Sequence, residues 1–151
     1  MPSAAASEEF WDARYRSAPA IWSGNPNPHL VADAGDLTPG RALDIGAGEG
    51  ADAIWLAQRG WTVTAVDISG VALRRARAEA ERHGPRVAER IEWLRADLTA
   101  WSPPVTAFDL VSIQFMHLPS AQRTPLFQRC IDAVAVGGTL LIVGHDESDL
   151  Q

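Results

Sequence analysis

Acidic side chains lie within or just after three short apolar segments of the chain, near points where a bound ligand could be reached. Asp44 precedes a glycine-rich turn, Gly46-Ala-Gly-Glu-Gly50, Asp67 comes about 20 residues after it, and Asp97 follows a third apolar segment. Glycines allow tight turns and a close approach of a ligand to the backbone. A carboxylate after the second segment can accept hydrogen bonds from ribose hydroxyls. The third acid can accept one from an adenine amino group, so the pattern indicates a nucleoside-containing cofactor.

Each of these features also has an ordinary structural explanation. The glycines can belong to a tight strand-to-helix turn, Asp67 can stabilise the start of a helix, and Asp97 can be a loop aspartate. The glycine turn also fits the looser pattern GxGxxA of nicotinamide enzymes, which would use Asp67 in the same way. A nicotinamide enzyme does not explain Asp44 and Asp97 together, so an oxidoreductase is the less favoured alternative.

The segments around these acids alternate between strand and helix patterns. Strands are expected at residues 41–45, 61–66, 90–95, 108–113 and 139–143, and helices from residue 8 and at 29–37, 51–59 and 69–83. Each crossover is long enough for a βαβ unit, which predicts an α/β fold with a parallel sheet covered on both faces. Ligands of such sheets bind beyond the carboxyl ends of the strands, where the three acids are expected.

The clearest helical period in the chain falls on Phe127, Cys130, Ile131 and Val134. Thr124 as the cap and Pro125 at the first helical position would start this helix, and Gly137-Gly138 would end it. Cys130 lies on the apolar stripe, so we expect a buried small hydrophobic side chain and not a nucleophile.

The amino-acid composition and net charge exclude several classes of function. The 151 residues are 46% hydrophobic and 21% charged, which predicts one globular domain. All 13 basic residues are arginines, which excludes lysine chemistry, and a net charge of −6 argues against nucleic-acid binding. The sequence has no apolar run of membrane-spanning length and no signal-peptide pattern, and it has one cysteine, so we expect no membrane partner and a cytoplasmic protein.

Four segments, taken together, resemble successive motifs of class I S-adenosylmethionine-dependent methyltransferases. They are Leu43-Asp-Ile-Gly-Ala-Gly-Glu-Gly50, Val66-Asp-Ile-Ser69, Ala96-Asp-Leu98 and Phe108-Asp-Leu-Val111. The N-terminal Phe10-Trp11 and Trp22-Ser-Gly-Asn-Pro-Asn-Pro28 resemble the small-molecule branch related to thiopurine and tellurite-resistance methyltransferases. The resemblance implies a Rossmann-like, doubly wound sheet in the order 3-2-1-4-5 and S-adenosylmethionine as the cofactor, with S-adenosylhomocysteine as its product.

The resemblance also implies roles for individual residues around the cofactor. The methionine part of the cofactor would be contacted by Asp44, Gly46, Ala47 and Gly48, with Gln114 under its end and Trp22 closing the pocket. The ribose hydroxyls would be bound by Asp67. The adenine would lie against Ile68, with Asp97 and Leu98 at its edge. Residues 1–40 would form a helical cap and lid, and residues 41–151 the cofactor-binding core of a single domain.

The sequence gives fewer indications of the residues that would bind the methyl acceptor. His117 follows the fourth expected strand and is either a general base or a loop histidine packed beside Met116 and Leu118, while Phe115, Met116, Trp22 and Trp11 could line the acceptor pocket. Four scattered histidines indicate no metal site. We expect in-line methyl transfer to a small-molecule acceptor; the alternative is a cofactor-binding or interaction protein without catalysis.

Family members usually continue past the fifth strand with a helix and an antiparallel strand pair, whereas this sequence stops at Gln151. We therefore expect a C-terminal truncation, as either a fragment or a reduced form. The fifth strand would then be an unprotected edge, which predicts that another chain covers it, as in a homodimer, or that the protein is prone to aggregation.

Overall fold

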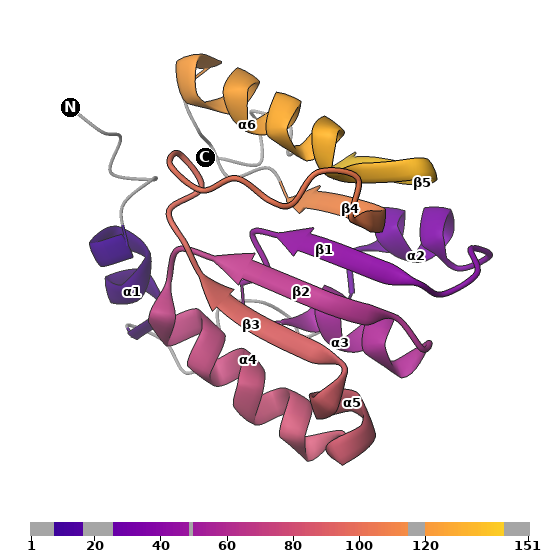
Figure 1. Ribbon diagram of the computed structural model, residues 1–151. Helices are drawn as coiled ribbons and strands as arrows, with labels where there is room; N and C mark the ends of the chain where they lie inside the picture. Colours follow the sequence, from indigo (N-terminus) through magenta and orange to yellow (C-terminus); the bar gives the residue numbers. More distant parts are fainter. Residues whose placement is uncertain (1–7, 17–25, 49, 115–119, 144–151) are drawn as a thin grey trace.

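A parallel sheet forms the centre of the computed structural model, which describes residues 8–16, 26–48, 50–114 and 120–143 (Figure 1). Its strands are β1 (Arg41–Ile45), β2 (Thr62–Asp67), β3 (Ile91–Arg95), β4 (Phe108–Gln114) and β5 (Val134–Val143). The order is β3-β2-β1-β4-β5, and every neighbouring pair is parallel. The predicted fold class and strand order are confirmed.

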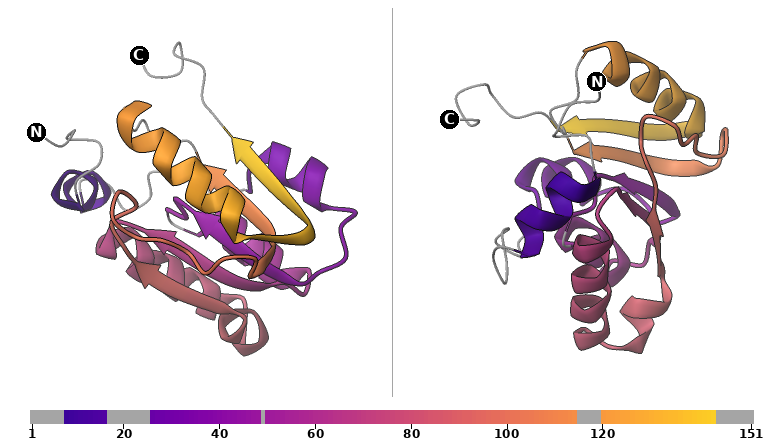
Figure 2. Two further views of the ribbon diagram at one scale, coloured as in Figure 1. Left: turned by 45° about the horizontal axis from the view of Figure 1, so that its top comes forward. Right: turned by 90° about the vertical axis from the view of Figure 1, so that its left-hand side faces the viewer.

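Six helices accompany the described strands. They are α1 (Glu8–Arg16), α2 (Pro28–Ala34), α3 (Ala51–Gln58), α4 (Gly70–Arg82), α5 (Pro85–Glu89) and α6 (Ser120–Ala133). The helix α6 lies on one face of the sheet, and α3 and α4 lie on the other (Figure 2). The two faces therefore each bury their own apolar core, as a doubly wound sheet requires.

The two cores follow the alternation of side chains along the strands. In β1, Ala42 packs toward α3, whereas Leu43 and Ile45 pack toward α6. Cys130 of α6 is buried in this second core, and burial raises the pKa of its thiol to about 11. An un-ionised thiol is a poor nucleophile, so the expected packing role of Cys130 is confirmed.

Local signals account for several helix starts. Ser69 caps α4, because its hydroxyl accepts a hydrogen bond from the Ala72 N–H at 3.1 Å. Asn27 caps α2, because its side chain accepts one from the His29 N–H at 2.8 Å, with Pro28 at the first helical position. The helix α2 ends at Ala34, which is earlier than expected, with Gly35 after it.

The prediction for the last helix is wrong in its start and its end, and its predicted apolar face is confirmed for Phe127, Cys130 and Val134, which pack in the second core, but not for Ile131. The helix α6 begins at Ser120, so Pro125 lies inside it, beyond the first turn, and removes one backbone donor. Its buried positions are Leu126, Cys130 and Ala133, while the side chain of Ile131 is half exposed. Packing of this face against the second core outweighs the local preference of proline for a helix start.

The fifth strand is longer than the sequence predicts. It begins at Val134, directly after α6, and contains Gly137-Gly138, which were expected to end the helix. The pairing with β4 moves from Phe108–Val134 to Leu110–Thr139, so the glycines lie in an irregular part of the ladder. A short helix was also missed: α5 starts at Pro85, a position that proline favours.

None of the helices described here has the length and apolar character needed to cross a membrane.

Candidate functional site

The glycine turn after β1 is tied to the carboxyl end of β2. The N–H groups of Gly46 and Ala47 both donate to the Val66 carbonyl, at 2.9 and 3.0 Å. Gly46 and Gly48 have φ values of 77° and 57°, a conformation that favours glycine. The turn therefore runs close beside the end of β2, and its glycines carry no side chain that would block a ligand from approaching their backbone.

Asp67 connects this turn to the start of α4. One carboxylate oxygen accepts a hydrogen bond from the Gly48 N–H and the other from the Ser69 N–H, both at 2.9 Å. Burial raises the pKa of Asp67, and backbone hydrogen bonds, led by that of Ser69, oppose the shift. Each oxygen can accept a further hydrogen bond, so the oriented carboxylate fits a pair of hydroxyl groups.

Asp44 is the least compensated charge in the described part of the chain. Its side chain is fully buried, and neither oxygen has a hydrogen-bond partner among the described residues. Burial raises the pKa of Asp44 well above its usual value, and the nearby charges of Asp52 and Asp67 raise it further. A buried carboxylate without partners is stabilised by a cation, so Asp44 fits the ammonium group of an amino-acid ligand.

Asp52 joins the site from the first turn of α3. Its side chain is buried, and one oxygen accepts a hydrogen bond from the Asn27 N–H at 2.7 Å. The contact anchors the chain before α2 next to the glycine turn. Asp52 was not identified from the sequence, although an acid two residues after Gly50, at the start of a helix, was the available signal.

Ser112 lies next to Asp44 on the neighbouring strand. The two residues are paired in the β1–β4 register, so their side chains lie on the same face of the sheet. Ser112 is buried, and its hydroxyl also has no hydrogen-bond partner within the described ranges. Ser112 was missed from the sequence as well, and the available signal was a serine within the apolar run of residues 110–113.

The residues expected at the adenine lie at the ends of β2 and β3. Asp97 is exposed, and one of its oxygens accepts hydrogen bonds from the Thr99 N–H at 2.9 Å and the Thr99 hydroxyl at 2.6 Å. The Leu98 side chain is buried in the second core, and its carbonyl accepts a hydrogen bond from Arg129 at 2.7 Å. Ile68 is buried in a small cluster beside α4. Their adenine-binding roles stay predictions.

The remaining candidates are placed in part or not at all. Gln114 is the last residue of β4, paired with Val143, and its side chain is not described. Trp22 and His117 lie outside the described residues. Phe115 and Met116 also lie outside them, so the expected pocket lining and base stay predictions.

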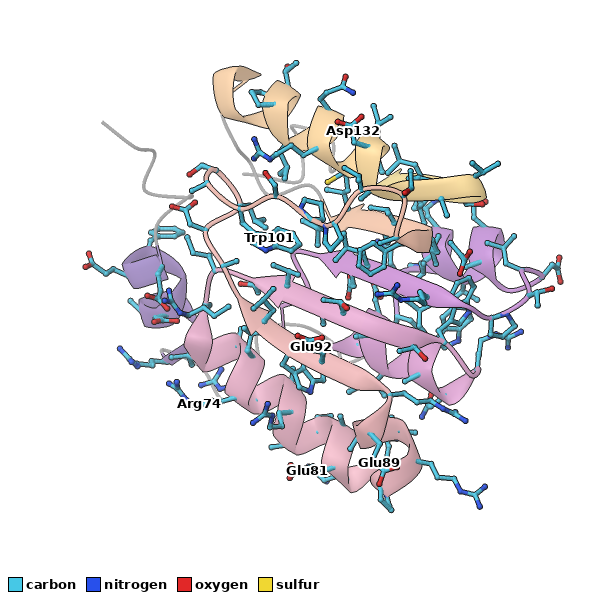
Figure 3. All side chains as sticks on the ribbon, in the orientation of Figure 1. Arg74, Glu81, Glu89, Glu92, Trp101 and Asp132 are labelled. Carbon is cyan, nitrogen blue, oxygen red and sulfur yellow. The ribbon has the colours of Figure 1, made fainter. Side chains whose placement is uncertain are left out.

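Several charged side chains of α4 and α5 lie away from this site. Arg74, Glu81 and Glu89 project from the outer sides of α4 and α5, and all three are exposed (Figure 3). The buried acids Asp44 and Asp67 instead lie at the carboxyl ends of β1 and β2, where the topology places ligands.

The strand order and the glycine turn define a class, the Rossmann-like domains that bind a nucleoside cofactor at the carboxyl ends of their strands. Within this class, the family model described as "Methyltransferase domain" matches residues 42–138. The chain therefore belongs to this family, among the class I S-adenosylmethionine-dependent methyltransferases. The narrower thiopurine and tellurite-resistance branch stays a prediction.

Individual proteins agree with this assignment. The chain is 33% identical over 150 residues to trans-aconitate 2-methyltransferase of Rhizobium meliloti (strain 1021), covering 97% of this chain and 51% of that protein. It is 32% identical over 123 residues to glycine N-methyltransferase of Oryctolagus cuniculus, covering 72% and 41%. A solved structure of a DhpI–SAH complex has a TM-score of 0.72 at 22% identity, covering 97% and 71%, and this likeness shows the fold.

The chain spans about half the length of the curated relatives it matches.

Proposed function

We propose that this chain binds S-adenosylmethionine and transfers its methyl group to a small-molecule acceptor. The observation that carries the proposal is Asp44, a buried carboxylate without a partner among the described residues, directly before the glycine turn. Asp67 adds an oriented carboxylate at the end of β2. Together they match two polar parts of the cofactor, the ammonium group of its methionine and the hydroxyl groups of its ribose.

When bound, the cofactor supplies a methyl group on a positively charged sulfur, which is already a good leaving group. The protein therefore has to orient the partners and keep water away. In this proposal Asp67 accepts the ribose hydroxyls and the glycine turn lets the ligand approach the backbone. Asp44 balances the ammonium charge, with Ser112 beside it. Asp97, Leu98 and Ile68 surround the adenine, and Gln114 and Trp22 close the methionine end.

A small acceptor is supported by the names of two relatives, a trans-aconitate and a glycine methyltransferase. We also propose that residues 1–40 cap the site and residues 41–151 form its core. His117 would border the acceptor, as a base or as lining. The net charge of −6 argues against nucleic-acid partners.

A second copy is the proposed partner of the outer edge of β5. Among the strands that the structure describes, β5 pairs with β4 alone, and Val136 and Ile142 are exposed along it. Unpaired strand edges favour association with another chain. Sedimentation at increasing protein concentration tests this: a monomer at all concentrations would contradict it.

Methyl release tests the catalytic proposal. The chain is incubated with labelled S-adenosylmethionine and a panel of small carboxylates, amines, phenols and thiols, with Asp67→Ala as the matched control. Turnover on one acceptor class that Asp67→Ala reduces supports the proposal. Binding of S-adenosylhomocysteine without transfer to any acceptor would instead support the cofactor-binding protein without catalysis.

A further inference from the structure

The N-terminal helix α1 crosses the start of α4, close to the carboxyl ends of β2 and β3 (Figures 1 and 2). Two acidic side chains of α1 hold it there. A carboxylate oxygen of Asp12 accepts hydrogen bonds from the Ser69 hydroxyl and from the Val71 N–H, the latter at 3.2 Å. Glu8 forms an ion pair with Arg95 at 3.0 Å. The helix is therefore docked at two separate points.

Ser69 is shared between this docking contact and the cofactor site. Its N–H donates to Asp67 at 2.9 Å, while its hydroxyl donates to Asp12 and accepts from the Ala72 N–H at 3.1 Å. Ser69 is fully buried, so water does not replace these partners. Asp12 and Asp67, which lie far apart in the sequence, thus bind the same residue.

This arrangement restricts Ser69 from both sides. A serine cap alone leaves its hydroxyl proton free to rotate, whereas the Asp12 carboxylate fixes the direction of that proton. The backbone N–H of Ser69 is then held by Asp67 and its side-chain hydroxyl by Asp12, so the N–H stays directed at Asp67. The Asp12 charge also reaches Asp67, whose pKa it raises as the smallest of the causes. Movement of α1 therefore changes the surroundings of Asp67.

We propose that Asp12 is a positioning residue for Asp67, acting through Ser69, so that docking of α1 and binding of the cofactor ribose strengthen each other. This inference rests on the proposed function, because it assigns the ribose hydroxyls to Asp67. Reciprocal strengthening follows from linkage: if the docked helix raises the affinity for the cofactor, the cofactor stabilises the docked helix by the same factor.

A double-mutant cycle on S-adenosylhomocysteine binding tests the proposal, measured by calorimetry on the full chain. Asp12→Asn should weaken binding about tenfold in the wild-type background, within the range of coupling between sites. In the Asp67→Ala background the same substitution should change the dissociation constant less than about twofold, because the group on which Asp12 acts is gone.

Glu8→Gln is the matched control on the same helix. It breaks the ion pair with Arg95 and leaves Ser69 untouched, so its effect should be small and equal in both backgrounds. Unfolding curves of every variant exclude a loss of fold as the cause.

Trypsin cleavage at Arg14 and Arg16 gives a second readout. S-adenosylhomocysteine should slow cleavage of the wild-type chain and of Glu8→Gln, but not of Asp12→Asn. An equal loss of affinity in both backgrounds for Asp12→Asn, or no loss in the wild type, would overturn the inference while the proposed function stands. A wild-type chain that does not bind S-adenosylhomocysteine would overturn both.

Discussion

Asp44 of β1 and Ser112 of β4 lie side by side in the sheet register, and both side chains are buried without a hydrogen-bond partner among the described residues. A buried polar group without a partner destabilises a fold by about 1–3 kcal/mol. A role in ligand binding explains why two buried polar groups beside the glycine turn lack partners in the described part of the protein, because a bound ligand would supply them.

Asp44→Asn should stabilise the chain without ligand at pH 8. Burial raises the pKa of Asp44 in the folded state, so the folded state binds the proton more tightly than the unfolded state. The free energy of unfolding of the wild type therefore falls as the pH rises from the ordinary carboxyl pKa through the raised one. The neutral amide removes this loss, and we expect a gain of about 1 kcal/mol or more at pH 8.

Urea unfolding at pH 4 and pH 8 checks this. The gain should shrink or vanish at pH 4, where the carboxyl group of the wild type is protonated in the folded chain. Equal effects of Asp44→Asn at both pH values would show that its charge is not the source of the destabilisation.

The same variant should lose affinity only for ligands that carry the ammonium group. Asp44→Asn is expected to weaken S-adenosylhomocysteine by about 1.5–3 kcal/mol, the scale of a hydrogen bond to a charged group. It should leave 5′-methylthioadenosine, which lacks the amino-acid part, nearly unchanged. Calorimetry with the two ligands measures the difference in affinity. An equal loss of affinity for both ligands would show that Asp44 does not contact the methionine part.

Gly50→Ala should destabilise the fold more than Gly84→Ala. Both glycines have a φ near 100°, but a Cβ on Gly50 would lie 2.7 Å from the Cβ of Ala76, whereas one on Gly84 meets nothing within 4 Å. We expect about 3 kcal/mol for Gly50 from strain and overpacking together, and about 1 kcal/mol for Gly84 from strain alone. Chemical unfolding of the two variants gives the comparison; equal losses would show that the close approach of Gly50 to Ala76 does not limit the packing of α3 against α4.

His117→Gln separates a general base from a lining residue. We expect the loss to fall on KM and to vary with the acceptor, because a soft acceptor is nucleophilic enough near neutral pH. A general base would instead lower kcat by about 10² and remove an ionisation near pH 6.5 from the pH–rate profile. Cofactor affinity should not change in either case.

The sequence predicts the strands well where apolar runs end at turn residues. β1 was predicted with its observed bounds, and β3 within one residue. The prediction fails at α6 and β5, because Pro125 and Gly137-Gly138 carry strong local signals that packing on the second core overrides.

The candidate site was predictable only in part. Asp44 and Asp67 were identified from their places just before the glycine turn and at the end of the second strand. Ser112 was missed although the expected strand order places the fourth strand beside the first, because a serine in a strand does not by itself indicate a ligand. Asp12 was missed because its contact with Ser69 joins residues far apart in the sequence, which no local pattern encodes.

In the proposed function, the carboxyl ends of β1 and β2 hold S-adenosylmethionine. Calorimetric titration of the full chain with S-adenosylhomocysteine and, separately, with NAD tests it most directly, with Asp67→Ala titrated alongside. We predict binding of S-adenosylhomocysteine at one site, no binding of NAD, and a loss of about 1.5–3 kcal/mol in folded Asp67→Ala. Binding of NAD instead, or unchanged S-adenosylhomocysteine affinity in the folded variant, would contradict it.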